Sequence, residues 1–371
     1  MKITTNREKL LHAFQTVAPI APARSPKPIL QNVKLEVAKD SATLMATDLE
    51  VGIRYQVDGI EVDVPGAAVL PVGRFGSILR ESTDATFRIE SDSEGTTIRG
   101  ERSQFKLPSE NPQDFPAIAE FGEKSFYELS ARLFRELIRR TIFATDNESS
   151  RYALGGVKLE WKDNLLTAVG TDGRRLAKME GPAQAVGQPA PFGDVTVVPT
   201  RAMQLLERAL AEDGSEVQLA VRQNDILVKN PRATIYSRLL EGRYPRWRDV
   251  FPQRANAIKI GLTVGPVYTA VRQAAIVTSE ESRGIDFTFG GGSLVLAGQT
   301  AEVGQSRVEL PIAYDGQAVT ITLDPRFVSD FLKVLDQEKS FTIDLQDGDS
   351  AAVCTTEDGY GYVIMPLARD R

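Results

Sequence analysis

The sequence predicts an α+β fold made of three copies of one domain, because three features recur along the chain with a period of about 125 residues. The first feature is a β-like run that leads directly into an amphipathic helix with a basic residue in its first turn. It occurs at residues 69–75, 197–203 and 322–327. Threefold internal repetition describes an architecture, and it narrows the functions to be considered.

Two shorter motifs repeat in the same way. Ala46-Thr47-Asp48 returns as Gly170-Thr171-Asp172, and Asp114-Phe115-Pro116 returns as Arg243-Tyr244-Pro245. A domain of this length is large enough to bury its own core. We therefore expect three domains, with boundaries at 1–122, 123–251 and 252–371.

Hydrophobic periodicity predicts two helices and several strands in each copy. Apolar residues at three- and four-residue spacing indicate helices at 6–18, 72–81, 130–142, 200–211, 264–279 and 325–335. Between the helices the period changes to two, as in Val33, Leu35 and Val37, and Asp-Gly and Glu-Gly turns are frequent. This pattern is typical of antiparallel meanders rather than of a parallel sheet.

The composition excludes several classes of enzyme. The charged fraction of 25% and the hydrophobic fraction of 42% are ordinary for a globular protein. Cys354 and His12 are the only residues of their types, so a Cys/His zinc site cannot be assembled from one of each. We expect no secretory signal and no membrane span, and hence a cytoplasmic protein. Phosphate-binding and dinucleotide-binding glycine loops are also absent.

Asp48 and Asp172 are the only acidic residues that recur at one position of the repeat. A metal-binding or acid/base role is conceivable, but a Thr-Asp pair at a strand end more often closes a turn. The third copy has Gly298-Gln299 there, which would not bind a metal equivalently. We therefore expect no catalytic residues, no cofactor and no metal, although a carboxylate enzyme that uses both aspartates stays an alternative.

The distribution of charge points to a polyanion. The whole chain carries a net charge of −6, yet the predicted helices are net positive. Their basic residues lie at three-, four- or seven-residue spacing and therefore share a side of each helix. No aromatic ladder accompanies them, which predicts contact with a nucleic-acid backbone without sequence readout. The alternative is a set of solvated helix faces on a protein-binding scaffold of repeated domains that does not encircle DNA.

Several motifs together resemble one family, the bacterial DNA polymerase III β subunits or β sliding clamps. The resemblance spans the whole chain. It rests on Lys27-Pro28-Ile29-Leu30 with Asn32, the 46–50 and 114–116 motifs, Arg151-Tyr152, Thr171-Asp172-Gly173-Arg174-Arg175-Leu176-Ala177, the 241–245 motif and Tyr362-Val363-Ile364-Met365-Pro366-Leu367. The resemblance implies a homodimeric ring of six domains joined head to tail, with the helices lining a hole that holds duplex DNA.

The resemblance also implies which residues face the DNA. The basic helix faces would form the inner wall, and two loop positions would add Arg24 and Tyr152. The complete implied set is Arg24, Arg74, Arg80, Arg132, Arg135, Arg139, Tyr152, Arg201, Arg208, Arg326 and Lys333. Such a ring would be a processivity factor with no catalytic site of its own.

Finally, the resemblance implies a hydrophobic groove between the second and third domains. It would bind short linear peptides of the replicative polymerase α subunit, the clamp loader, other DNA polymerases, mismatch repair proteins and ligase. Two positions depart from the usual pattern: Arg174 replaces a histidine and Asp249 replaces an arginine. The implied groove residues are Leu154, Thr171, Gly173, Arg174, Arg175, Leu176, Pro245, Val250, Phe327, Val363, Ile364, Met365, Pro366 and Leu367.

Overall fold

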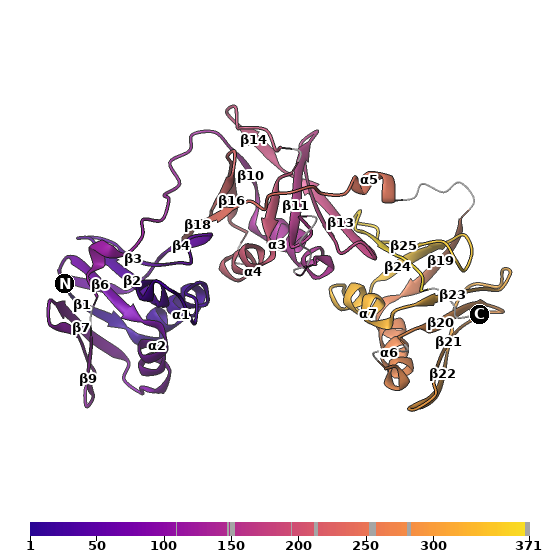
Figure 1. The fold of residues 1–371 in the computed structure, drawn as a ribbon, viewed down its shortest axis with the longest axis horizontal. Helices are drawn as coiled ribbons and strands as arrows, with labels where there is room; N and C mark the ends of the chain where they lie inside the picture. Colours follow the sequence, from indigo (N-terminus) through magenta and orange to yellow (C-terminus); the bar gives the residue numbers. More distant parts are fainter. Residues whose placement is uncertain are drawn as a thin grey trace. The chain divides into compact units, whose positions relative to one another are not determined.

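In the computed structural model, one order of elements occurs three times: a strand, a helix, several strands, a second helix and three further strands (Figure 1). It describes the chain except residues 109, 147, 149–152, 194, 211–213, 252–256, 280–282 and 368–371. The first copy contains β1 (Lys2–Asn6), α1 (Arg7–Val17), β2 (Asn32–Val37), β3 (Ala42–Thr47), β4 (Val51–Gln56), β5 (Ile60–Val64), β6 (Gly66–Pro71), α2 (Val72–Glu81), β7 (Thr86–Asp92), β8 (Gly95–Arg99) and β9 (Gln104–Leu107).

The second and third copies repeat this order, the third with one strand fewer between its helices. The second contains β10 (Phe126–Ser130), α3 (Ala131–Arg139), β11 (Gly156–Lys162), β12 (Leu165–Thr171), β13 (Arg175–Pro182), β14 (Gln184–Val186), β15 (Val197–Pro199), α4 (Thr200–Ala209), β16 (Glu216–Val221), β17 (Asp225–Lys229) and β18 (Ala233–Arg238). After the short α5 (Trp247–Val250), the third contains β19 (Ile258–Thr263), α6 (Val264–Ala274), β20 (Ile285–Gly290), β21 (Ser293–Thr300), β22 (Gly304–Pro311), β23 (Val319–Leu323), α7 (Pro325–Lys333), β24 (Ser340–Leu345), β25 (Ala352–Thr355) and β26 (Gly361–Ile364).

All six predicted helices are confirmed, and their local sequences explain where they begin. The Asn6 side chain accepts a hydrogen bond from the Lys9 amide at 3.0 Å and caps α1, and Asp324 caps α7 through the Arg326 amide at 2.9 Å. The first helix of each copy ends earlier than its apolar pattern suggested, most clearly α6. In each case a 3-10 turn follows, at Ala18–Ile20, Ile142–Ala144 and Ala275–Val277.

The chain divides into two compact units, and the second copy contributes to both. The first unit comprises Met1–Arg135, Ala183–Asp194 and Arg201–Leu239, and the second comprises Glu136–Pro182, Val195–Thr200 and Leu240–Arg371. The first unit holds a nine-stranded sheet of order β14-β10-β16-β17-β18-β4-β3-β2-β6 and a five-stranded sheet of order β5-β1-β7-β8-β9. The second holds an eight-stranded sheet of order β15-β11-β12-β13-β26-β25-β24-β19 and a four-stranded sheet of order β22-β21-β20-β23.

Within each unit, backbone pairing joins strands from two consecutive copies. In the first unit, β18 of the second copy pairs antiparallel with β4 of the first, from Ala233↔Tyr55 to Ser237↔Val51. In the second unit, β26 of the third copy pairs with β13 of the second, from Arg175↔Ile364 to Lys178↔Gly361. The last strand of one copy thus continues a sheet of the copy before it.

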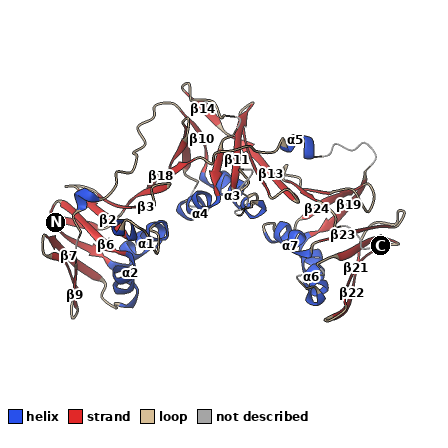
Figure 2. Ribbon diagram, viewed as in Figure 1, coloured by secondary structure: helices blue, strands red, loops and turns tan. Residues whose placement is uncertain are grey.

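The helices of each unit bury their apolar faces against one another and against these sheets (Figure 2). In the first unit, α1 packs on α2, and the Phe14 and Phe75 rings meet edge to face with centroids 5.2 Å apart. In the second unit, α6 packs on α7. The fully buried Phe331 of α7 stacks on Tyr360 and Tyr362 at 5.5 and 5.1 Å.

The Thr-Asp motifs close turns, as their sequence favoured. After β3, the Asp48 carboxylate accepts hydrogen bonds from the Glu50 and Val51 amides at 3.0 and 2.7 Å. After β12, Asp172 accepts equivalent bonds from Arg174 and Arg175 at 2.9 and 3.0 Å. The residue after each aspartate has a left-handed backbone, with φ of 79° at Leu49 and 85° at Gly173.

The third copy differs from the sequence alignment at this turn. The register of β21 and β22 ends at Thr300↔Gly304, whereas the first two hairpins end at Thr47↔Gly52 and Thr171↔Leu176. Thr300 therefore occupies the threonine position and Ala301 the acidic one. The predicted equivalent, Gly298-Gln299, was wrong because this hairpin tip is one residue shorter. The turn still lacks an aspartate.

We expect alanine at two exposed glycines to shift stability in opposite directions. Neither Gly173 nor Gly73 would bring a new Cβ within 4 Å of another group, but only Gly173 has a positive φ. Gly173→Ala should therefore lower the free energy of unfolding by about 1 kcal/mol, and Gly73→Ala in α2 should raise it by up to about 1 kcal/mol. Urea unfolding curves measure both, and a shift of the same sign for the two variants would contradict the explanation.

Candidate functional site

The predicted groove residues lie in the second unit, around the end of the β13–β26 pairing. Arg175 and Leu176 at the start of β13 face Ile364 and Val363 at the end of β26. Beyond the paired region, the Met365 amide donates to the Arg174 carbonyl oxygen at 2.9 Å. The Leu367 amide donates to the Thr322 carbonyl oxygen on β23 at the same distance. The segment from Met365 to Leu367 is thus held between the Thr171–Arg175 turn and the four-stranded sheet.

Burial divides the predicted groove residues into a surface set and a supporting set. Val250 and Met365 expose 46% and 44% of their area. Gly173 and Arg174 are also exposed, and Arg175, Pro245, Phe327, Pro366 and Leu367 are half-buried. The buried members are Leu154, Thr171, Leu176, Val363 and Ile364.

A compact apolar cluster supports the surface set from behind. It joins Trp247 of α5 to Val169, Leu176, Val353 and Val363 of the eight-stranded sheet, with Tyr244 and Phe251 packed against it. The Tyr244 hydroxyl donates to the Val169 carbonyl oxygen at 2.9 Å, and burial raises the pKa of that phenol. Sequence reasoning missed Trp247 as a support residue. The aromatic side chains on both sides of Pro245 were the available signal.

Arg175 is the most connected polar residue of the site. Its guanidinium group bonds three acceptors, namely Asp172 Oδ2 at 3.0 Å, Asp330 Oδ2 at 2.6 Å and the Phe143 carbonyl oxygen at 2.7 Å. It also lies over the Phe327 ring, 4.4 Å from the centroid. The side chain is only 10% exposed. The resemblance implied that Arg175 lines the groove, and in this structure its donors are engaged by the protein itself.

A second charged network holds α5 on the sheet. The Glu160 carboxylate on β11 accepts from Lys158 Nζ and Arg248 Nη2, each at 2.7 Å, and from the Trp247 indole at 3.3 Å. Burial opposes ionisation of Glu160, but the hydrogen bonds from Lys158 and Arg248 outweigh it and lower the pKa of the carboxyl group. This network fixes the segment that presents Val250. Nothing in the sequence pattern identified Glu160.

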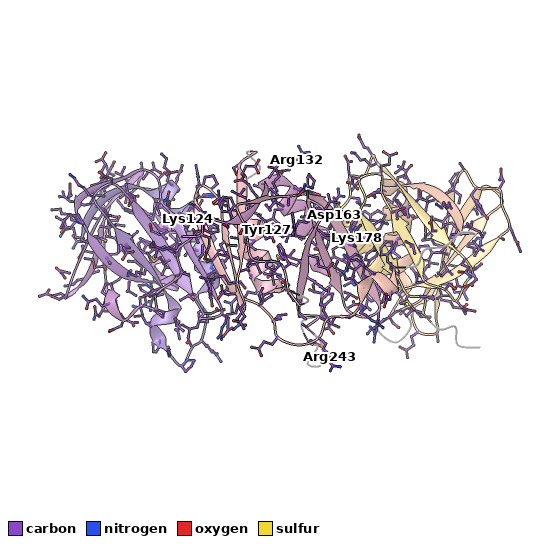
Figure 3. The ribbon with its side chains drawn as sticks, turned by 90° about the horizontal axis from the view of Figure 1, so that it is seen from above. Lys124, Tyr127, Arg132, Asp163, Lys178 and Arg243 are labelled. Carbon is purple, nitrogen blue, oxygen red and sulfur yellow. The ribbon has the colours of Figure 1, made fainter. Side chains whose placement is uncertain are left out.

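In the first unit, the basic residues predicted to face DNA differ in whether another group of the protein binds their side chains. Arg24, Arg74, Arg132 and Arg208 are exposed, and within the described part of the chain their side chains form no ion pair (Figure 3 for Arg132). Arg201, in contrast, pairs with Asp48 at 2.6 Å and donates to the Ile20 carbonyl oxygen at 2.8 Å. Two further members are Arg80, which donates to Ser77, and the half-buried Arg135.

The second unit contains the remaining predicted DNA-facing residues. Arg139 pairs with Glu136 at 3.6 Å and donates to the Val334 carbonyl oxygen, and Arg326 pairs with Asp324 at 2.6 Å. Lys333 is exposed and, among the described residues, has no ion-pair partner. Tyr152 lies outside the described residues. Where the pattern predicted uniform basic faces, the folded chain therefore holds both uncommitted cations and cations paired within the protein.

Among the described residues, no cluster of three or more His, Cys, Asp or Glu side chains could hold a metal ion. No helix in the described part of the chain is long and apolar enough to cross a membrane.

Comparisons with known proteins agree along the whole chain. Family models described as the DNA polymerase III β subunit N-terminal, central and C-terminal domains match residues 1–119, 128–246 and 248–368. A β sliding clamp of Pseudomonas putida is 30% identical over 372 residues, covering 99% of this chain and 100% of the relative. One of Chlamydia pneumoniae is 29% identical over 368 residues, covering 99% of each chain.

Solved structures agree with the sequence comparisons. The sliding clamp of Pseudomonas aeruginosa bound to griselimycin superimposes with a TM-score of 0.90 at 29% identity, and each chain is covered completely. The Bacillus subtilis sliding clamp has a TM-score of 0.88 at 21% identity, a likeness that concerns the fold.

We expect Glu160 to make the second unit sensitive to acid. Because its pKa is lowered on folding, its contribution to stability is present above the unfolded value of about 4.3 and is lost as the pH falls through the lower, folded pKa. The free energy of unfolding of the wild type should therefore fall more steeply below about pH 4.3 than that of Glu160→Gln. Urea unfolding at a series of pH values measures the two slopes, and parallel slopes would contradict the assignment.

Proposed function

Because the chain belongs to the DNA polymerase III β subunit family, the β sliding clamps, we propose that two molecules of it join head to tail and close into a ring around duplex DNA. The ring tethers the replicative polymerase to its template, so processivity comes from topology rather than from tight contact. It is a processivity factor and not an enzyme. We place it in the cytoplasm, where it meets the replicating DNA.

The observation that carries ring closure is the strand pairing between consecutive copies. β18 and β26, the last strands of the second and third copies, continue the sheets of the copies before them through β4 and β13. The corresponding last strand of the first copy is β9, and the strand corresponding to β4 and β13 in the third copy is β22. Both are edge strands. The same rule therefore pairs β9 of one molecule with β22 of a second molecule, which removes two exposed sheet edges.

The surface beside β9 suits such a contact. Phe105 on this edge strand is 36% exposed, and it lines a cleft of about 770 Å³ together with Ile78 and Glu81 of α2. Phe75, Leu79 and Leu107 are buried in the core of the first unit. We therefore assign the interface of the first copy to the β9 edge with its exposed Phe105, opposite the β22 edge with its exposed Arg307.

Within the ring, the uncommitted cations are the best candidates for phosphate contacts. We propose that Arg24, Arg74, Arg132, Arg208 and Lys333 face the DNA backbone. The other residues of the implied set stay candidates. Among them, Arg139, Arg201 and Arg326 are paired with carboxylates and should attract phosphate less. Few direct contacts suit a ring that must slide.

We also propose that the groove of the second unit docks the short linear peptides of partner proteins. The exposed Val250 and Met365, with half-buried Pro245, Pro366 and Leu367, offer an apolar surface for one or two anchor side chains. The replicative polymerase α subunit and the clamp loader are the first expected partners. Other DNA polymerases, mismatch repair proteins and ligase would compete for the same surface.

The domain boundaries stay a proposal at 1–122, 123–251 and 252–371. The family models match residues 1–119, 128–246 and 248–368, so the first proposed boundary lies between two matches and the second lies a few residues inside the third match. The two sheets that run between consecutive copies explain why compactness alone divides the chain differently.

Retention on DNA tests the ring. Loaded by a clamp loader onto nicked circular DNA, the protein should stay bound and should dissociate once the DNA is linearised. Phe105→Asp should shorten retention on the circle about tenfold or more, because it buries a charge at the joint. Gel filtration of DNA-bound protein before and after linearisation measures both effects.

Val64→Asp is the matched control, since Val64 is 49% exposed on β5, at the other edge of the same sheet. It should leave retention unchanged. Persistence of the wild type on linear DNA would refute the sliding ring, and full retention of Phe105→Asp would refute the interface.

Peptide affinity tests the groove. Val250→Ala combined with Met365→Ala should weaken binding of a synthetic polymerase α-subunit peptide about thirtyfold, because each substitution removes apolar contact area worth roughly 1 kcal/mol. Isothermal titration calorimetry measures the dissociation constant. Leu165→Ala, at an exposed position of the same unit on β12, should leave it unchanged. Equal affinities for wild type and double variant would refute the groove assignment.

A further inference from the structure

The polar centre behind the groove is an ion pair between a turn and a helix. Arg175 ends the turn that Asp172 closes, and its Nη1 donates to Asp330 Oδ2 on α7 at 2.6 Å. The arginine is 10% exposed and the aspartate 40%, so water screens the pair only in part. Asp330 is the only carboxylate that reaches this guanidinium from outside its own turn, among the contacts of the described residues.

The first unit contains the same device with the charges reversed. There the turn supplies the acid, Asp48, and the helix of the next copy supplies the base, Arg201 of α4, at 2.6 Å. Two different sequences therefore arrive at one arrangement, in which an ion pair ties the Thr-Asp turn of one copy to the second helix of the copy that follows. A recurrence with exchanged charges indicates that the tie itself is needed, rather than either residue.

In the second unit, this tie lies next to the segment that carries the exposed Met365. Arg175 is fixed from three directions, and its neighbour Arg174 presents the carbonyl oxygen that accepts from the Met365 amide at 2.9 Å. Arg175 also stacks on Phe327, whose carbonyl oxygen accepts from the Tyr362 hydroxyl at 3.0 Å. Movement of the turn relative to α7 would therefore shift Met365, which is bonded to the turn, relative to Phe327, which belongs to α7.

We propose that Asp330 is a positioning residue for peptide docking, which acts through Arg175 to hold the Thr171–Arg175 turn, Phe327 and Met365 in a binding-ready arrangement. The inference rests on the proposed groove. Preorganisation of this kind raises affinity because the free protein no longer has to order these groups on binding. Asp330 itself needs no contact with the peptide.

The test compares Asp330→Asn with Asp48→Asn, the same chemical change at the equivalent tie in the first unit. Asp330→Asn should weaken binding of the synthetic polymerase α-subunit peptide about three- to tenfold, measured by calorimetry on the full chain. It should also speed hydrogen exchange at the Met365 amide, whose acceptor belongs to the turn. Asp48→Asn should leave both quantities at wild-type values. Asp330→Glu, which keeps the charge, should restore most of the affinity.

The outcomes separate this inference from the proposed function. If the wild type itself does not bind the peptide, the groove assignment fails. If the wild type binds and Asp330→Asn binds equally well or more tightly, the groove stands and the positioning role is overturned. A loss of affinity with unchanged Met365 exchange would also overturn it, because the effect would then not pass through the turn. Thermal unfolding of both asparagine variants verifies that each is folded.

Discussion

Antiparallel backbone pairing between consecutive copies is the interaction on which the rest of this structure depends. A sheet edge exposes unpaired N–H and C=O groups, and the β18–β4 and β26–β13 pairings satisfy those groups with strands of the neighbouring copy. Copies linked in this way cannot shift register without moving every side chain to the opposite face. The pairing explains why two compact units arise from three copies, and why β9 and β22 remain as edges for a second molecule.

The proposed groove depends on that pairing. β26 ends beside the start of β13, so the Thr171–Arg175 turn and the residues after Ile364 come together, although nearly two hundred positions separate them in the sequence. A buried cluster with Trp247 and Val363 then supports exposed Val250 and Met365. The first unit has the same turn and the same type of tie, but there Gly52 takes the place of Leu176 in the hairpin register and Ile118 fills the adjacent space. Repetition thus builds the joints, and substitution at one joint shapes the surface that we propose for docking.

Charge in this protein serves two purposes that composition cannot separate. The chain is acidic overall, and its helices are basic. Some of these cations pair with acidic side chains of the same unit, namely Arg201, Arg326 and Arg139. Arg132 and Lys333 have no such ion pair among the described residues. Phosphate attraction falls off within about a Debye length and is weakened by a neighbouring carboxylate, so the second group contributes most to any field that guides DNA.

The sequence by itself determined the repeat, the six helices, the turn-closing role of Asp48 and Asp172, and the family, because these depend on local periodicity and short-range hydrogen bonds. It misjudged the third hairpin, where Thr300 and not Gly298 aligns with Thr47, since register is a property of two paired strands. Only the tertiary structure revealed that Arg175 donates hydrogen bonds to Asp330 and to the Phe143 carbonyl oxygen. It also revealed that Glu160 accepts a hydrogen bond from Trp247, and that Val363 and Ile364 are buried beneath the proposed groove. The physical reason is the same in each case: burial and ion pairing are decided by groups that the fold brings together from distant parts of the chain, and no local pattern records them.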